Sequence, residues 1–240
     1  MNQSIVITDL TKEYKGGTKA LKGISLQIAE GEMFGLLGVN GAGKTTLVKI
    51  LCCLTKPTSG TATVCGTDVC KNPQEVKKIV DFSPQETSVA PNLTVEENLE
   101  FFAQIYDKNT PEHIKSVMDA FSLGEVANRR AGKLSGGWKR RLSVAVALIS
   151  EPQVLFLDEP TLGLDVLARR ELWKIIERLK GNITIVLTSH YLEEIEALCD
   201  RVAVLSDGKL LATGTTEELI KQTGANNFED AFVSIVEAAQ

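Results

Sequence analysis

The segment Gly38–Thr45, with the sequence GVNGAGKT, constrains this chain more than any other. It fits the pattern G-x-x-x-x-G-K-[ST], in which glycines let successive backbone N–H groups turn towards one phosphate group. The apolar run Met33–Leu37 precedes it and the helical pattern Leu47–Leu54 follows it, so the phosphate would lie at a helix N-terminus. Lys44 would contact the β- and γ-phosphates, and the Thr45 hydroxyl would be an oxygen ligand for Mg²⁺. The segment therefore predicts a phosphate-binding site.

Short apolar runs elsewhere predict an α/β fold with a parallel central sheet. Runs without polar alternation are typical of strands that helices cover on both faces. These runs are Met33–Leu37, Val154–Leu157, Ile183–Leu187 and Val202–Leu205. At the N-terminus, Ser4–Leu10 and the alternating residues 24–28 predict an antiparallel sheet instead. Val202–Leu205 and Leu210–Ala212, separated by Asp207-Gly208, predict a hairpin.

Between Gln85 and Gly137 the chain has no convincing strand and reads as an inserted helical subdomain, for which we expect the bounds 87–140. Thr94–Glu97 is a capping box before one amphipathic helix, and Thr110-Pro111 begins a second. After the main domain, residues 1–222, we expect a short helical tail over residues 223–240.

Composition excludes several classes of protein. The chain has 240 residues, 43% of them hydrophobic, which excludes wholesale disorder. Its formal net charge of −5 argues against a nucleic-acid partner, because neutralising phosphates requires a basic excess. The longest apolar runs, such as Leu142–Ile149, fall short of the ~20 residues that span a bilayer. Charged residues by position 9 leave no secretory leader, so we expect a cytoplasmic location.

Two carboxylates follow the apolar run Val154–Leu157. Asp158 would lie beside the phosphate loop and hold Mg²⁺ directly or through water, and Glu159 could orient or deprotonate an attacking water. Solvated acids at a strand end are the alternative interpretation, and the neighbouring phosphate loop argues against it.

The segment Leu134–Gly137, of sequence LSGG, begins another helix and predicts a second anion site. One nucleotide does not need two such sites from one chain. The surplus suggests that each nucleotide contacts two chains, although such a short segment is also compatible with an ordinary loop.

With these residues in place, the sequence resembles ATP-binding cassette (ABC) transporter ATPase subunits over nearly its whole length. Gly38–Thr45 resembles Walker A, Leu134–Gly137 the signature motif, and Val154–Glu159 Walker B with its catalytic glutamate. The resemblance implies a RecA-like P-loop NTPase core. It implies catalytic roles for Glu159, for the switch histidine His190 and for the Q-loop glutamine Gln85.

The same resemblance implies the ligand contacts. ATP would be the nucleotide. Tyr14 would stack on the adenine ring, unless it only packs against other side chains, and Asp165 would belong to the D-loop. The implied nucleotide-binding residues are Tyr14, Gly38, Asn40, Gly41, Ala42, Gly43, Lys44, Thr45, Thr46, Ser135, Gly136, Gly137 and Asp165. The implied Mg²⁺ ligands are Thr45, Gln85 and Asp158.

The resemblance also implies partners. Two cassettes, as a homodimer or heterodimer, would close on two ATP molecules and drive a separately encoded transmembrane permease at the inner face of the membrane. Thr161–Trp173 and Phe228–Phe232 resemble the ABC-2 type exporter branch, whose cargoes differ too widely for a substrate to be inferred. Trp138 stands where the signature motif usually has a glutamine. The alternative function is therefore a nucleotide-binding regulator with little or no hydrolysis.

Two further expectations concern basic side chains. A cluster of arginines and lysines around the signature segment is expected to form a solvated rim. Its members are Arg129, Arg130, Lys133, Lys139, Arg140 and Arg141. His113, on a helix beside charged neighbours, is expected to be solvated as well.

Overall fold

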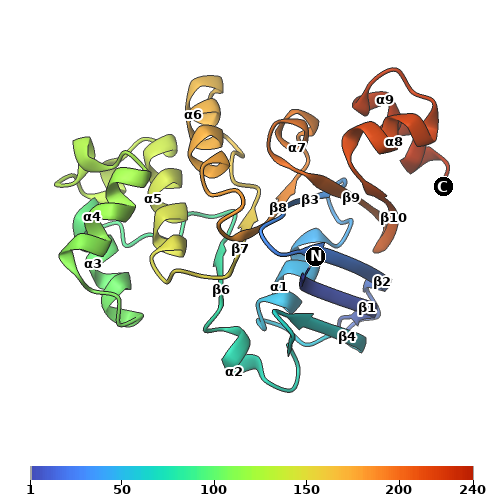
Figure 1. Cartoon of the computed structure of the whole chain (residues 1–240), viewed down its shortest axis with the longest axis horizontal. Helices are drawn as coiled ribbons and strands as arrows, with labels where there is room; N and C mark the ends of the chain where they lie inside the picture. Colours follow the sequence, from blue (N-terminus) through green and yellow to red (C-terminus); the bar gives the residue numbers. More distant parts are fainter. Residues whose placement is uncertain (1, 240) are drawn as a thin grey trace.

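A six-stranded sheet forms the centre of the molecule in the computed structural model, which describes residues 2–239 (Figure 1). Its spatial order is β10-β9-β3-β8-β7-β6, with parallel pairs from β9 to β6 and an antiparallel pair β10–β9. The strands are β3 (Met33–Leu37), β6 (Val80–Ser83), β7 (Val154–Asp158), β8 (Thr184–Ser189), β9 (Arg201–Ser206) and β10 (Lys209–Gly214). Every residue of β3, β7 and β8 is buried, since the helix after the phosphate loop and the N-terminal strands cover one face of the sheet and helices cover the other. The predicted α/β fold class, with its 202–212 hairpin, is confirmed.

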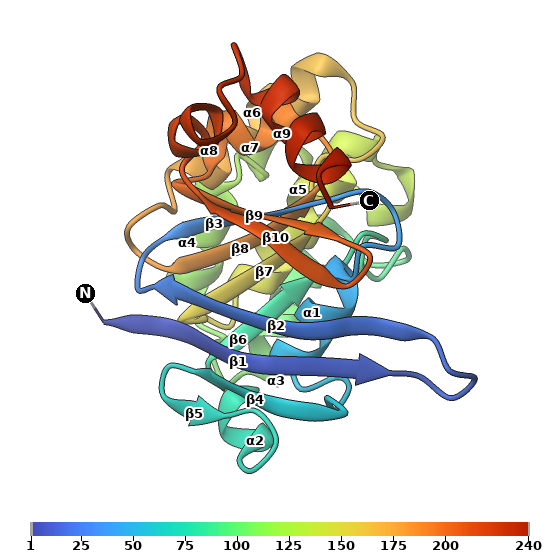
Figure 2. The same ribbon diagram turned by 90° about the vertical axis from the view of Figure 1, so that its right-hand side faces the viewer.

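A second sheet, antiparallel and four-stranded, lies below the first in Figure 2. It contains β1 (Gln3–Glu13), β2 (Lys19–Ala29), β4 (Ser59–Val64) and β5 (Thr67–Asp68) in the order β2-β1-β4-β5. Alternate residues of β2, among them Ile24 and Ile28, are buried in one core with Leu47 and Ile50 of α1 (Lys44–Leu51). The N-terminal antiparallel sheet is thus confirmed, and it packs against the helix that follows the phosphate loop.

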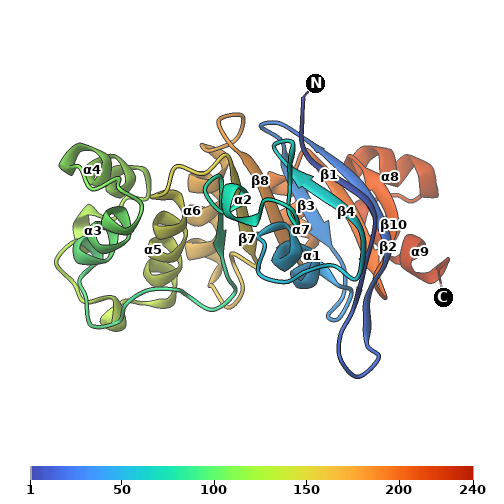
Figure 3. The same ribbon diagram turned by 90° about the horizontal axis from the view of Figure 1, so that it is seen from below.

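Between β6 and β7 the chain is helical, as predicted. Helices α3 (Val95–Ile105), α4 (Pro111–Ala120) and α5 (Gly136–Leu148) lie together at one end of the long axis, opposite the antiparallel sheet (Figures 1 and 3). The capping box at the start of α3 is present: Thr94 Oγ1 accepts from Glu97 N at 3.1 Å, and Glu97 Oε2 accepts from Thr94 N at 2.7 Å. Shorter elements are α2 (Pro73–Val76) and two 3₁₀ turns, Gly124–Val126 and Ala131–Lys133.

Four helices complete the fold: α6 (Val166–Glu177), α7 (Leu192–Leu198), α8 (Thr216–Thr223) and α9 (Phe228–Glu237). The predicted C-terminal helix is α9, which buries Phe228 and Ala231 and packs against α8, β9 and β10. The proposed domain boundaries at residues 87, 140 and 222 remain predictions. Within residues 2–239, no helix combines the length and apolar character needed to cross a membrane.

The expectation of a solvated basic rim is wrong for two arginines. Arg140 is 3% exposed and Arg141 8%, because α5 packs against β6 on one side and α6 on the other. Arg141 forms an ion pair with Glu171 of α6, and its guanidinium carbon lies 4.6 Å from the Trp138 ring centre. Arg129, Arg130 and Lys133 are exposed as expected.

The expectation for His113 is also wrong. Its side chain is 18% exposed, and its Nε2 lies 2.9 Å from the carbonyl oxygen of Ile149 at the end of α5. The ring therefore bridges α4 and α5 instead of facing solvent.

Candidate functional site

The glycine-rich loop joins β3 to α1, as its sequence context requires. A Cβ atom on Gly38 would lie 2.3 Å from the carbonyl oxygen of Leu205, and one on Gly43 would lie 2.6 Å from that of Ala20. Gly43 is the N-cap of α1 with φ of 103° and provides no side-chain cap. The first N–H groups of α1 therefore lack the partner that a capping side chain supplies, which suits them to bind an anion.

Lys44 begins α1 and is 6% exposed. Its Nζ donates to the carbonyl oxygens of Gly38 at 2.6 Å and Val39 at 3.3 Å. Burial lowers the pKa of Lys44, and the charges of Glu159 and Asp158 act in the opposite direction. The loop thus holds a cationic donor beside the open helix end, where the phosphates of a nucleotide would lie.

Asp158 ends β7 and is buried, and two threonine hydroxyl groups donate to its carboxylate. Thr45 Oγ1 donates to it at 3.2 and 3.3 Å, and Thr188 Oγ1 donates to Oδ1 at 2.5 Å. A threonine hydroxyl and a carboxylate from different elements, meeting beside the phosphate loop, are the hard oxygen donors that Mg²⁺ prefers. The residues therefore fit the predicted metal.

Thr188 is a residue that motif reading missed. It lies opposite Asp158 in the β7–β8 pair, and its hydroxyl also accepts from the backbone N of Glu159 at 3.1 Å. In the sequence, Thr188 is only a threonine near the end of an apolar run. Its contact with Asp158 depends on the pairing of β7 with β8, which the sequence pattern does not give.

Glu159 adopts the left-handed backbone region, with φ of 49°. Its carboxylate Oε2 lies 2.5 Å from Nδ1 of His190, which follows β8. The Glu159 side chain is 11% exposed and the His190 side chain 34%. The structure therefore pairs the two predicted catalytic side chains.

One cavity of about 450 Å³ collects many of the predicted residues. Its lining includes Tyr14, Asn40, Gly41, Ala42, Gly43, Lys44, Thr45, Thr46, Gln85 and Glu159. Tyr14 is 40% exposed, its hydroxyl lies 3.4 Å from Thr46 Oγ1, and the Lys12 Nζ lies 5.0 Å from the centre of its ring. Asp207 and residues 18–20 also line this cavity and were not predicted.

The signature segment and Asp165 are not among the residues that line this cavity. Ser135 and Gly136 are exposed at the start of α5, and Ser135 makes no side-chain capping bond there. Asp165 instead caps α6, its Oδ1 accepting from Leu167 N at 2.9 Å and Ala168 N at 3.0 Å. Within one chain, the two predicted anion-binding helix ends are therefore separate.

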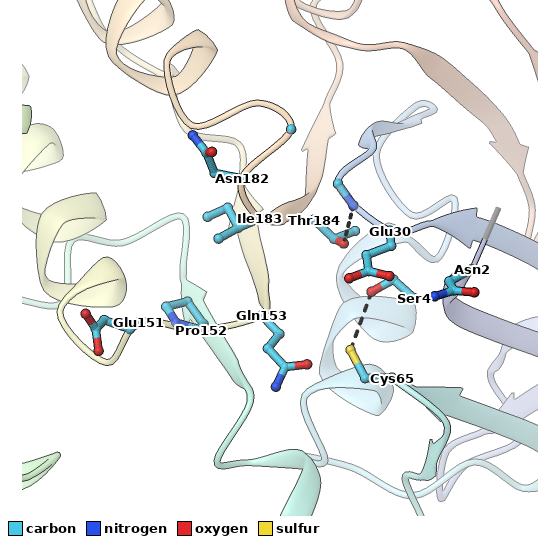
Figure 4. Close-up of a pocket in the computed structure, with 12 residues that line it drawn as sticks. Asn2, Ser4, Glu30, Cys65, Glu151, Pro152, Gln153, Asn182, Ile183 and Thr184 are labelled. Carbon is cyan, nitrogen blue, oxygen red and sulfur yellow. Dashed lines mark hydrogen bonds between the residues drawn. The ribbon is translucent and has the colours of Figure 1, made fainter.

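A larger cavity of about 670 Å³ opens at the opposite edge of the sheet (Figure 4). Gln153 and Thr184, at the starts of β7 and β8, line it, together with Ser4 and Cys65, whose Oγ and Sγ atoms are 3.6 Å apart. Of the described residues in its lining, none belongs to the predicted site. Ligands of open α/β sheets bind at the carboxyl ends of the strands, where the phosphate loop lies.

The fold and the glycine-rich cavity define the class of the protein: a P-loop nucleotide-binding domain. Residues 21–162, more than half of the chain, match the ABC transporter family. The chain therefore belongs to the ABC transporter family, whose ATP-binding cassettes are ATPases.

Individual proteins agree with this assignment. The chain is 41% identical over 235 residues to ABC transporter A family member 10 of Arabidopsis thaliana, covering 93% of this chain and 26% of the plant protein. It is 38% identical over 240 residues to the doxorubicin resistance ATP-binding protein DrrA of Mycobacterium tuberculosis, covering 98% of this chain and 71% of DrrA. A solved dimeric ATP-binding cassette in a post-hydrolysis state, bound to ADP and Pi, is 26% identical with a TM-score of 0.78, covering 88% of this chain and 98% of that one. The chain spans about a quarter of the length of the plant relatives that it matches.

Proposed function

We propose that this chain is the ATP-binding and ATP-hydrolysing subunit of an ABC exporter, and that two cassettes close around two ATP molecules. The observation that carries this proposal is the separation of the two anion-binding helix ends. The phosphate loop lines the cavity, whereas Ser135 and Gly136 are exposed elsewhere on the same chain. A second cassette that presents its own Ser135 end would complete each site.

In this proposal each nucleotide is bound from both sides. The loop Gly38–Gly43, Lys44 and Thr46 bind the phosphates, and the exposed Tyr14 ring stacks on adenine. The second cassette binds the γ-phosphate from the opposite side through Ser135, Gly136 and Gly137. Asp165 lies in a loop at the contact between the two cassettes. The solved dimeric cassette with ADP and Pi supports such an assembly.

Different residues bind the metal ion and orient the attacking water. Thr45 and Asp158, with Gln85 at the rim of the cavity, would hold Mg²⁺, which neutralises negative charge on the β- and γ-phosphates. Glu159 orients the attacking water and takes its proton. His190, 2.5 Å from that carboxylate, fixes the orientation of Glu159 and contacts the γ-phosphate.

Closure of the dimer then drives transport. ATP favours the closed form, and loss of the γ-phosphate reopens it, so that hydrolysis shifts a two-state equilibrium. The work is done on a separately encoded transmembrane permease docked near residues 85–93, with the cassette at the cytoplasmic face of the membrane. DrrA, named for doxorubicin resistance, supports the export direction and the ABC-2 branch.

The first test compares wild-type protein with Glu159→Gln. Wild-type protein should release phosphate, whereas Glu159→Gln should bind ATP, hydrolyse it on the order of 10²-fold or more slowly, and elute as a dimer in size-exclusion chromatography. Near-normal turnover by Glu159→Gln would remove the role of this carboxylate. Wild-type protein that binds ATP without releasing phosphate would instead support the alternative of a nucleotide-binding regulator.

The second test addresses the shared site. Lys44→Ala and Ser135→Arg damage opposite halves of each proposed site, so a mixed dimer contains one site with both halves intact. Phosphate release by the mixture should exceed that of both parents and peak near equal amounts. A rate equal to the weighted sum of the parents, with an active monomer in ultracentrifugation, would contradict the two-chain site.

A further inference from the structure

No sequence motif assigns a role to Arg140, although the residue is buried. It lies in the second turn of α5, five positions after Ser135, and is 3% exposed. Its guanidinium makes four hydrogen bonds, each to a backbone carbonyl oxygen. Burying a charged side chain costs free energy unless hydrogen bonds and nearby opposite charges compensate it, and for Arg140 the direct partners are backbone carbonyl groups.

The four carbonyl oxygens belong to the two segments that carry the proposed hydrolytic side chains. Arg140 NH2 donates to Asp158 O at 2.8 Å and Nε donates to Pro160 O at 2.7 Å. NH1 donates to Pro84 O at 2.5 Å and Gln85 O at 3.2 Å. One side chain thus connects the end of β7 with the end of β6.

The contacts at β7 enclose Glu159. The carbonyl groups of the residues immediately before and after it are both bound to the same guanidinium. Glu159 itself has φ of 49°, a region that side-chain-bearing residues rarely adopt and that persists only where the surroundings hold it. Arg140 supplies part of that support from outside the strand.

The charge of Arg140 survives its burial. Burial lowers the pKa of Arg140 to about 10, and the nearby charges of Asp158, Glu194 and Glu159 act in the opposite direction. The guanidinium is therefore protonated at neutral pH, and its hydrogen bonds are charge-assisted.

We propose that Arg140 is a positioning residue for ATP hydrolysis, which fixes the backbone on both sides of Glu159 and joins it to the Gln85 segment. The inference depends on the proposed function, since it requires that Glu159 act on the attacking water. Arginine suits this role because its planar group presents five N–H donors in fixed directions, whereas the lysine ammonium is a single point.

The first experiment measures phosphate release by full-length Arg140→Gln and Arg140→Lys, with rates expressed per nucleotide-binding site so that unfolded protein does not count. We expect kcat to fall on the order of 10²-fold in Arg140→Gln, as for small displacements of a reacting group, with the KM for ATP within about threefold. Arg140→Lys should recover part of that loss. Arg141→Gln, the same change at the next buried arginine, should lower thermal stability and leave kcat per site within about threefold.

The second experiment separates positioning from general structural support. In a Glu159→Gln background, Arg140→Gln should change the residual single-turnover rate by less than about threefold, because the group through which it acts is already lost. An equal loss in both backgrounds would overturn the inference, as would loss of nucleotide binding by both Arg140 variants. Wild-type activity in Arg140→Gln would refute this inference alone, whereas inactive wild-type protein would refute the proposed function on which it rests.

Discussion

Replacing Thr188 by valine isolates the hydrogen bonds that surround Asp158, because valine has nearly the same shape and no hydroxyl. Thr188 is fully buried and Asp158 is 4% exposed. The change removes the 2.5 Å bond from Thr188 Oγ1 to the Asp158 carboxylate. The Glu159 N–H keeps a partner, since it also donates to the Thr188 carbonyl oxygen at 3.1 Å.

The expected cost follows from these contacts. A hydrogen bond to a charged group contributes about 1.5–3 kcal/mol, and no cavity is created, so Thr188→Val should lower the free energy of unfolding by about 2 kcal/mol. With a urea m-value of about 2–3 kcal/mol/M, the unfolding midpoint should fall by roughly 0.7–1 M. Fluorescence of Trp138 and Trp173 can follow the transition.

Thr184→Val is the matched control, in the same strand and equally buried. The Thr184 hydroxyl accepts from the neutral backbone N of Gly31 at 3.0 Å, so its loss should cost only about 1 kcal/mol. A Thr188→Val protein that is no less stable than Thr184→Val would refute the claim that the Asp158 carboxylate depends on this hydroxyl.

Two further predictions concern charged groups. Lys44→Ala should weaken ATP binding more than ADP binding in a calorimetric titration, because the lost cation would contact the γ-phosphate that ADP lacks; equal losses would contradict that contact. Burial raises the pKa of Glu194 above its ordinary value of 4.5, so above that value the folded chain holds more protons than the unfolded one, and stability falls as the pH rises through the folded pKa. Glu194→Gln should therefore lose less stability than wild-type protein in urea unfolding as the pH rises above 4.5, and an identical decline in both proteins would contradict this.

The fold could be predicted wherever a short segment determines its own structure. Val154–Leu157 has no polar alternation and therefore becomes a central strand, and Thr94–Glu97 contains both halves of its capping box. The phosphate loop is similar, since its glycines, lysine and threonine act within one turn of chain. By contrast, Ser59–Val64 and Val80–Ser83 became strands through pairing with β1 and β7, and no strong apolar pattern marks them.

The residues of the candidate site could be predicted where a motif or the family resemblance marks them, as for Tyr14, Gln85 and Glu159, but the contacts of residues outside those motifs could not. Arg140 was expected in solvent because it belongs to a run of basic residues, and the carbonyl groups that bury it lie about 20 and 55 positions away. Thr188 meets Asp158 only because β8 pairs with β7 in register. Both errors concern contacts between segments, which a pattern along one segment does not contain.

The separation of the two anion-binding helix ends has an electrostatic consequence for the proposed dimer. Each helix N-terminus carries partial positive charge, and Lys44 adds a full one beside the phosphate loop. In the proposed dimer the two positively polarised helix N-termini, at Ser135 and Lys44, face each other across a cavity whose wall also includes the carboxylates of Glu159 and Asp207, and further negative charge between the two helix ends favours their approach. A nucleotide triphosphate supplies that charge, and removal of its γ-phosphate takes part of it away. In the proposed dimer, the charges of the two helix ends would therefore contribute to the dependence of closure on ATP, in addition to the specific hydrogen bonds to the nucleotide.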